Sequence, residues 1–453
     1  MQATLAPVED SQRLPALDVA RGIALLGILL VNVQSFGEPF GDFIAFRPEA
    51  EQGWPAWIAF YFVKIFCEAK FFTLFSTLFG MGLAIQLGRS LAKGQSFASL
   101  TTRRISALGV FGLLHATLLW YGDILFMYAI SAIPFAFLVR AKAKTLLIVA
   151  AGLMFVSMLL SAGFGAFMVM GEQQKQAMVE AEKKNAATDV AADATTKDSV
   201  SQETPEVDAN AAVSPFEKLW KGWQQGEGHD PASGLWRSVE VECYKHGPTL
   251  DAILMRTMEW LMILIVMTVS GGYFWIIAMF AIGAALLKLD IFATDRRHWL
   301  KRIMIAGWGV GIPIAVLYAF YGVSTGSIGL GALAGFLNVP ASSAVALGTL
   351  AAISLLATSD ATKQMMKPFA NVGRLGLSNY LLQTAICTTI FYYWGFGLFD
   401  DLTRVQRMGI VFGVYAFQLI VSALWLRVFR IGPMEWLWRT FTYLKVQPIL
   451  RAK

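Results

Sequence analysis

Long stretches of apolar residues recur along the whole chain, and they constrain its fold more than any other feature. The first is LPALDVARGIALLGILLVNVQSF at residues 14–36. A helix needs about 20 mostly apolar residues to cross the hydrocarbon core of a bilayer. Charged residues make up only 15% of the 453 positions, against roughly 25% in an average soluble chain. The sequence therefore predicts an all-α, polytopic integral membrane protein surrounded by membrane lipid.

Ten segments of this kind are long enough to span a bilayer. They lie at residues 14–36, 69–88, 104–121, 124–139, 145–170, 263–288, 300–322, 341–357, 376–396 and 407–427. The apolar run 252–289 is too long for one span, so we expect residues 252–262 to form an interfacial turn. The glycine-rich segment 326–336 is either a loop or a re-entrant piece.

The connections between spans alternate in charge. Basic residues follow the second, fourth, sixth, eighth and tenth spans, whereas the other connections are acidic or uncharged. The long connection 171–250 contains 14 acidic and 8 basic residues. Lys and Arg concentrate in cytoplasmic loops of membrane proteins, so this pattern predicts ten spans with both termini in the cytoplasm. It also explains the net charge of +6 without a nucleic-acid partner.

The same pattern divides the chain into four parts. Residues 14–170 form an N-terminal membrane bundle, 171–250 an acidic extracytoplasmic loop, 251–427 a C-terminal membrane bundle, and 428–453 a basic cytoplasmic tail at the interface. Within the loop, residues 172–212 offer no apolar face to bury, so we expect them to lack a fixed structure. The loop is accordingly predicted to be partly disordered.

Three polar residues stand inside the first span, where charges cost about 2.5–3.5 kcal/mol each and suggest function. Arg21 and Asn32 are eleven residues apart, which places them on one helix face roughly 16 Å apart. Asp18 lies one turn before Arg21 and can pair with it. This polar stripe is expected to face the bundle interior. The alternative is a structural Asp–Arg pair together with an interhelical bond of Asn32.

His115 is expected to lie in the outer half of the third span, in HATLLWYGDIL. A neutral imidazole beside a carboxylate is well suited to act as a general base. Asp123 could orient it, although eight residues on a continuous helix leave the two side chains about 80° apart. The alternative is a histidine that only packs helices together.

The ninth span contains a polar face in GRLGLSNYLLQ. Arg374, Ser378, Asn379 and Gln383 follow helical spacing there. Such a face either joins helices or lines a cavity.

Several classes of chemistry find no support in the sequence. It contains no P-loop, no G-x-S-x-G elbow and no H-E-x-x-H motif. Its cysteines, Cys67, Cys243 and Cys387, form no C-x-x-C pair and no cluster with metal-ligand spacing, so they are interpreted as separate packing residues. We therefore expect no metal.

Five stretches in this order resemble the YeiB-like family of bacterial membrane proteins, which carry a domain of unknown function. They are LDVARGIALLGILLVN, KFFTLFSTLFGMG, HATLLWYGDILFMYA, GRLGLSNYLLQ and GPMEWLWR, and the resemblance covers nearly the whole chain. The family is similar to a wider group of transmembrane acyltransferases, which includes the lysosomal heparan-α-glucosaminide acetyltransferase and the O-acetyltransferases of cell-surface polysaccharides. Those enzymes transfer an acyl group from cytoplasmic acyl-CoA to a glycan hydroxyl or amine across the membrane.

The resemblance implies roles for particular residues. Arg21, with Asp18 and Arg374, would bind acyl-CoA as co-substrate, and Asn32 would hold the acceptor or the oxyanion. In the polysaccharide enzymes a histidine stands at the position of Asn32, so the general base here must come from elsewhere.

His115, oriented by Asp123, is then the candidate base. The function implied is acyl transfer to an extracytoplasmic acceptor, a glycan, a lipid or a small molecule, by a multi-pass protein of the bacterial cytoplasmic (inner) membrane. A carrier or efflux protein for a small or lipidic molecule, with the same polar stripe lining its path, is an alternative. A non-catalytic envelope factor is another.

Overall fold

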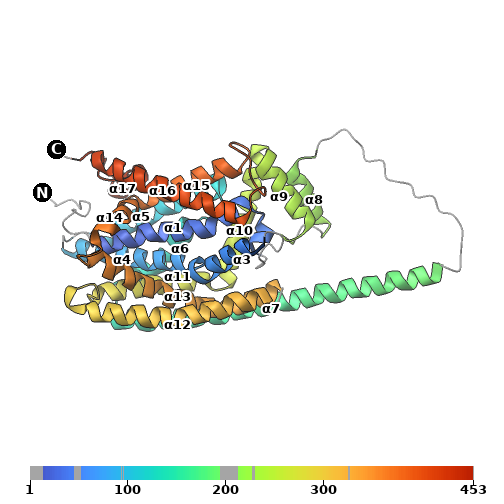
Figure 1. Cartoon of the computed structure of the whole chain (residues 1–453), viewed down its shortest axis with the longest axis horizontal. Coiled ribbons are helices and arrows are strands. Elements are labelled where there is room, and N and C mark those ends of the chain that lie inside the picture. Colours follow the sequence, from blue (N-terminus) through green and yellow to red (C-terminus); the bar gives the residue numbers. More distant parts are fainter. Residues whose placement is uncertain are drawn as a thin grey trace.

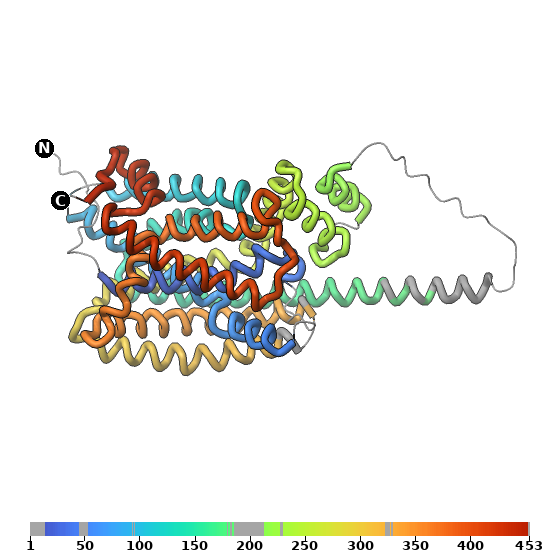
Figure 2. The backbone as a smooth tube through the Cα atoms, turned by 45° about the horizontal axis from the view of Figure 1, so that its top comes forward, coloured from blue at the N-terminus to red at the C-terminus, as the bar shows by residue number. Residues whose placement is uncertain are grey.

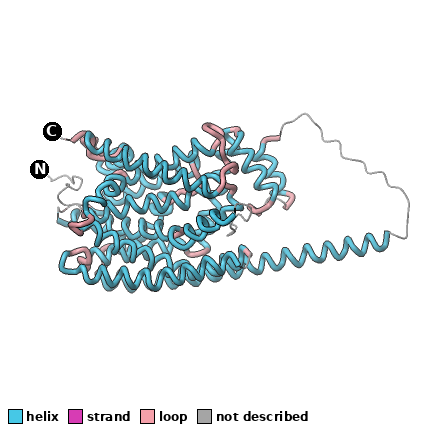
Figure 3. Tube along the Cα trace, in the orientation of Figure 1, coloured by secondary structure: helices cyan, strands magenta, loops and turns pink. Residues whose placement is uncertain are grey.

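The chain folds into a bundle of helices. A computed structural model describes residues 14–44, 53–92, 94, 96–193, 213–226, 230–324 and 327–451, and within these ranges no β-strand is present (Figure 3). The helices are α1 (Pro15–Gly37), α2 (Phe40–Ile44), α3 (Gly53–Phe62), α4 (Lys70–Ala92), α5 (Phe97–Leu114), α6 (Leu125–Leu138), α7 (Ala143–Asp193), α8 (Pro215–Gln224), α9 (Gly234–His246), α10 (Thr249–Val269), α11 (Gly272–Lys288), α12 (Arg297–Ser324), α13 (Ile328–Thr358), α14 (Lys363–Arg374), α15 (Gly376–Phe391), α16 (Arg404–Val428) and α17 (Pro433–Tyr443). Short π-helical turns, η3 (Val63–Cys67) and η4 (His115–Leu119), precede α4 and follow α5, and the 3₁₀ turn η5 (Thr294–Arg296) precedes α12.

The long apolar helices confirm a polytopic membrane protein. Seven described segments are long and apolar enough to cross a bilayer, and α6 and α11 are shorter apolar helices beside them. Most run along the long axis of the molecule (Figure 1). α17 lies at one end of this bundle, and α8 and α9 lie at the other. Each predicted span except the sixth falls on one helix, if α5 is taken together with η4.

Two expectations about connections are corrected by the structure. The run 252–288 is not a turn followed by one continuous helix, because it forms two helices, α10 and α11. They are separated at Gly271, whose φ of +77° is a left-handed conformation that favours glycine. The glycine-rich segment 326–336 is neither a loop nor a re-entrant piece over its described part, since α13 already begins at Ile328.

The prediction of disorder is wrong for residues 172–193. α7 continues through them to Asp193 and extends well beyond the rest of the bundle (Figure 2). The segment has no apolar face, but it is rich in Ala, Glu, Gln and Lys, which favour helix by intrinsic propensity alone. Residues 194–212 lie outside the described part of the chain, so the prediction made for them is not tested.

The later part of the long loop folds against the end of the bundle opposite α17 (Figure 1). Trp236 of α9 is completely buried, and Arg237 forms an ion pair with Asp400 at 2.7 Å. Glu240 accepts two contacts from the Phe40 backbone N–H, at 2.8 and 3.0 Å. Burial, followed by the nearby charge of Glu259, raises the pKa of the Glu240 carboxyl well above its ordinary value. α9 is therefore held on the bundle by a buried tryptophan, a buried carboxylate contact and an exposed ion pair.

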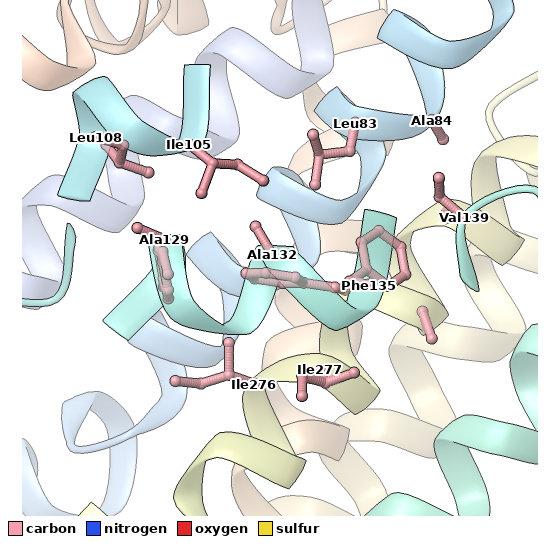
Figure 4. Close-up of a cluster of buried hydrophobic side chains, with 14 of the residues drawn as sticks. Leu83, Ala84, Ile105, Leu108, Ala129, Ala132, Phe135, Val139, Ile276 and Ile277 are labelled. Atoms are coloured by element: carbon pink, nitrogen blue, oxygen red, sulfur yellow. The ribbon is translucent and has the colours of Figure 1, made fainter. Parts of the chain in front are cut away.

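Close backbone packing joins the helices at the centre. A Cβ atom on Gly80 of α4 would lie 2.1 Å from the Phe280 carbonyl oxygen, and one on Gly283 of α11 would lie 2.0 Å from that of Thr77. Small residues at such crossings let membrane helices approach closely. Aliphatic and aromatic side chains from α4, α5, α6 and α11 fill the space beside this crossing (Figure 4).

Candidate functional site

His115 begins η4, where α5 widens into a π-helical turn. Single π-helical turns within α-helices occur frequently at functional sites. The helix ends at Trp120, whose backbone is extended (φ −162°, ψ 131°), and the chain then folds back toward His115. Only 2% of the His115 surface is exposed, so its polar atoms depend on protein partners.

Asp123 reaches His115 because the helix has ended. Its Oδ2 atom lies 2.9 Å from His115 Nδ1, and its Oδ1 atom accepts a hydrogen bond from the Phe126 N–H at 2.7 Å. The 80° separation expected on a continuous helix is thus removed by the loop 120–124. Gly112 makes the return possible, because a Cβ there would lie 2.3 Å from Phe126 N and 2.7 Å from Asp123 Oδ1.

Thr384 of α15 contacts the other ring nitrogen. Its Oγ1 atom lies 2.9 Å from His115 Nε2, against 3.5 Å from the Tyr380 carbonyl oxygen. A carboxylate only accepts hydrogen bonds, so a proton on Nδ1 satisfies Asp123 and leaves a lone pair on Nε2. The Thr384 hydroxyl then donates to that lone pair. In this tautomer of the neutral ring, His115 can accept a proton from a hydroxyl group.

Trp120 adds an unused donor beside the imidazole. Its ring centroid lies 6.2 Å from that of His115. Its indole N–H is buried and has no hydrogen-bond partner among the described residues. A buried unpaired donor of this kind is uncommon in folded proteins. Sequence reasoning gave no role to Trp120 or to Thr384, although Thr384 directly follows the polar Gln383.

The polar face of α15 joins helices rather than standing open. Gln383 bonds to Gln418 of α16 at 2.9 Å and to the Leu25 carbonyl oxygen of α1 at 3.4 Å. Asn379 donates to Ser422 at 3.0 Å. Of the two interpretations of this face, the described contacts favour interhelical hydrogen bonding.

A carboxyl group of α17 contacts the start of α15, next to this polar face. Glu435 accepts hydrogen bonds from the Leu377 and Ser378 backbone N–H groups, at 2.6 and 3.1 Å, and from the Ser378 hydroxyl at 2.5 Å. Burial raises the pKa of its carboxyl, while the contacts from Ser378 oppose that rise. The carboxyl group of α17 thus bonds to the first turn of α15.

Arg21 and Asp18 form the pair expected from their spacing, with 2.7 Å between Nη1 and Oδ1. The Arg21 side chain remains 30% exposed, and Asn32 is half-buried farther along α1. Among the described contacts, no hydrogen bond joins Arg21 or Asn32 to His115. α15 contacts both parts of the protein, because Gln383 bonds to α1 and its neighbour Thr384 bonds to His115. α1 also packs directly on the segment after His115, where the ring of Phe36 stacks on that of Trp120 at 4.2 Å. Their convergence on one cavity stays a prediction.

Arg374 ends α14, which packs tightly along α1. A Cβ on the preceding Gly373 would lie 1.8 Å from the Asp18 carbonyl oxygen. The structure thus places Arg374 one residue beyond a close backbone contact with the Asp18 segment.

A basic pocket opens at the end of the bundle that contains α17, the end predicted to be cytoplasmic. It has a volume of about 130 Å³ and lies between α4, α5 and α17. Three arginines, Arg89, Arg104 and Arg439, line it. In the sequence these residues indicate the cytoplasmic side, and Arg439 also lies in the predicted interfacial tail.

Neither metal ligands nor paired cysteines are found in the described part of the chain. No group of three or more His, Cys, Asp or Glu side chains there could hold a metal ion. The three cysteines are free and buried.

Comparison with known proteins identifies the family. The chain is 30% identical over 460 residues to "Uncharacterized protein YxaH" of Bacillus subtilis (strain 168), an alignment that covers 99% of each chain. It is 27% identical to "Uncharacterized protein YeiB" of Escherichia coli (strain K12), over 97% of this chain and 98% of that protein. The chain belongs to the YeiB-like family. The family description "Protein of unknown function (DUF418)" matches residues 286–445, which include Thr384 of this YeiB-like protein but not His115.

Proposed function

We propose that this YeiB-like protein transfers an acyl group from cytoplasmic acyl-CoA to a hydroxyl or amine of an acceptor on the other side of the bacterial cytoplasmic membrane. The observation that carries the proposal is His115, which lies between Asp123 at Nδ1 and a hydroxyl group at Nε2. A base, a group that orients it and a hydroxyl within hydrogen-bonding distance are what acyl transfer to an alcohol requires. The resemblance to transmembrane acyltransferases supports the same reaction class.

In this proposal the Thr384 hydroxyl marks the position that the acceptor hydroxyl takes. Rotation of the Thr384 side chain frees Nε2 of His115, which then removes the proton of the acceptor as its oxygen bonds to the acyl carbon. The carbon–sulfur bond breaks, and Nε2 returns the proton to the departing sulfur. Asp123 stabilises the imidazolium between these two transfers, as a buried carboxylate does beside a catalytic histidine.

Trp120 suits a further task at the same site. Acyl transfer places negative charge on the carbonyl oxygen, and preoriented donors that meet this charge contribute strongly to catalysis. The indole N–H of Trp120 is buried and unpaired beside His115. We propose that it donates to the developing oxyanion. Asn32 remains a candidate to hold the acceptor.

The residues proposed to hold acyl-CoA lie toward the end that is predicted to be cytoplasmic. The exposed part of Arg21 offers a cation for phosphate, while its bond to Asp18 fixes its direction. Arg374 lies on the helix that packs against the same part of α1. CoA supplies the activated thioester, and these side chains would orient it.

A pair of matched histidine variants tests the proposal. Purified protein in lipid nanodiscs is incubated with labelled acetyl-CoA and a mixture of glycan and lipid acceptors, and CoA release is measured. His115→Ala should lower the rate about 10²–10⁴-fold, whereas His298→Ala, at an exposed position at the start of α12, should leave it unchanged. Acceptor-dependent CoA release that survives in His115→Ala would remove His115 from the mechanism. Protein-dependent flux of an intact solute, without CoA release, would favour a carrier.

A further inference from the structure

The pocket between α4, α5 and α17 has the chemistry of an anion site. Its lining contains three arginines and, among the residues described there, no Asp or Glu. Arginine is the side chain best suited to bind phosphate, because its planar group offers several parallel donors. Two of the cations come from the consecutive helices α4 and α5, and the third comes from α17, which is distant in the sequence. Only the folded bundle brings Arg439 to the other two.

Arg104 is held in place by the surrounding protein. Its Nη1 atom donates to Gln86 Oε1 at 3.0 Å, and its guanidinium lies 4.4 Å from the ring centroid of Trp438. The indole N–H of Trp438 donates in turn to the Arg104 carbonyl oxygen at 3.1 Å. Such contacts fix the plane of the guanidinium before a ligand arrives, which lowers the entropy cost of binding.

One donor of Arg104 is left without a partner. Its Nε atom is buried and makes no hydrogen bond to the described residues. This free donor disfavours a vacant pocket, since an anion would accept its hydrogen bond.

The size of the pocket limits what it can hold. A volume of about 130 Å³ exceeds the roughly 10–15 Å³ needed for one water molecule, so a small tetrahedral anion can enter. Gly82 contributes to this space, because a Cβ added there would meet no atom within 4 Å. A large ligand would place only one end in the pocket.

We propose that this pocket binds the phosphate group of a ligand presented at the predicted cytoplasmic face. The phosphate belongs either to a soluble phosphate ester, such as a nucleotide or CoA, or to the headgroup of an inner-leaflet phospholipid. The chemistry of recognition is the same in both cases. This inference does not rest on acyl transfer, because a carrier would need the same contacts to hold a phosphorylated ligand.

Binding measurements on purified protein test the site and separate the two sources. Calorimetry follows pyrophosphate and CoA binding in detergent, and native mass spectrometry follows phosphatidylglycerol retained from nanodiscs. Arg439→Gln should weaken binding about tenfold or more, which corresponds to the loss of one charge-assisted contact. Arg430→Gln, an exposed position outside the pocket, should have no effect.

Gly82→Leu provides a second test that changes no charge. The added side chain fills open space inside the pocket, so the protein should fold while phosphate is excluded. Loss of pyrophosphate or CoA binding in both pocket variants supports a soluble ligand, and loss of retained phosphatidylglycerol alone supports a lipid. If the folded wild-type protein binds none of these, or if Arg430→Gln weakens binding as much as Arg439→Gln, the inference is overturned.

Discussion

Asp123→Asn removes a charge from the candidate site while nearly preserving its shape. The asparagine Oδ1 atom can still accept the hydrogen bond from the Phe126 N–H that Asp123 accepts at 2.7 Å. The amide NH₂ group then faces His115 Nδ1, where a carboxylate oxygen lies now at 2.9 Å. Because an amide nitrogen only donates, the proton on Nδ1 must leave and the ring must adopt the other tautomer. Nε2 would then donate to Thr384 and could no longer accept a proton from a hydroxyl.

The expected magnitudes differ for stability and for rate. A hydrogen bond to a charged group contributes about 1.5–3 kcal/mol, and a neutral one about 1 kcal/mol. Asp123→Asn should therefore lower the free energy of unfolding by only about 1–2 kcal/mol. The loss of general-base catalysis should lower acceptor-dependent CoA release about 10²–10⁴-fold.

Both quantities are measured on the same purified sample, by thermal unfolding in detergent and by CoA release in nanodiscs. Asp123→Ala is the companion variant, because it also removes the contact with Phe126 and should be the less stable of the two. If Asp123→Asn unfolds normally and retains activity within about tenfold of wild type, the tautomer argument is refuted.

Three further predictions concern packing, pH and topology. Gly283→Ala should destabilise the bundle by about 1–3 kcal/mol, because its Cβ would lie 2.0 Å from the Thr77 carbonyl oxygen. Gly88→Ala is the control and should not destabilise the bundle, because its Cβ would meet no atom within 4 Å. Equal thermal unfolding midpoints for the two variants would contradict the prediction. Burial raises the pKa of Glu435 above its ordinary 4.5, so its contribution to stability is present below pH 4.5 and is lost as pH rises toward the raised value. The thermal unfolding midpoint of wild type, compared with that of Glu435→Gln, should fall as the pH rises over that range. A rise in this difference would contradict the prediction. Gln176→Cys, on the exposed extension of α7, should react with an impermeant thiol reagent in intact cells; labelling only after lysis would reverse the topology.

The membrane fold follows from local features of the sequence, because hydropathy is a property of each segment alone. The stretches around α1, α12 and α16 are apolar over the length of a span, and lipid permits only helices there. The break between α10 and α11 is different, since it depends on the conformation of one residue, Gly271. The extension of α7 was missed because its helix arises from propensity and not from an apolar face.

The candidate site was predictable only in part. His115 and Asp123 stand out as polar residues near the end of one span, and the structure brings them together. Thr384 could not be found in this way, because it is separated from His115 by 269 residues and nothing in local periodicity shows that α15 packs against η4. For the same reason the sequence could not show that α15 contacts both His115 and α1.

Transfer across a sealed membrane tests the central proposal most directly. The protein is reconstituted in liposomes with labelled acetyl-CoA on the side of α17 and hydroxyl-bearing glycan and lipid acceptors on the side of α9. The proposal predicts CoA release on the first side and labelled product on the second, both lost in His115→Ala and kept in His298→Ala. If correctly folded wild-type protein releases no CoA and forms no labelled product with any acceptor, the proposed acyl transfer is contradicted.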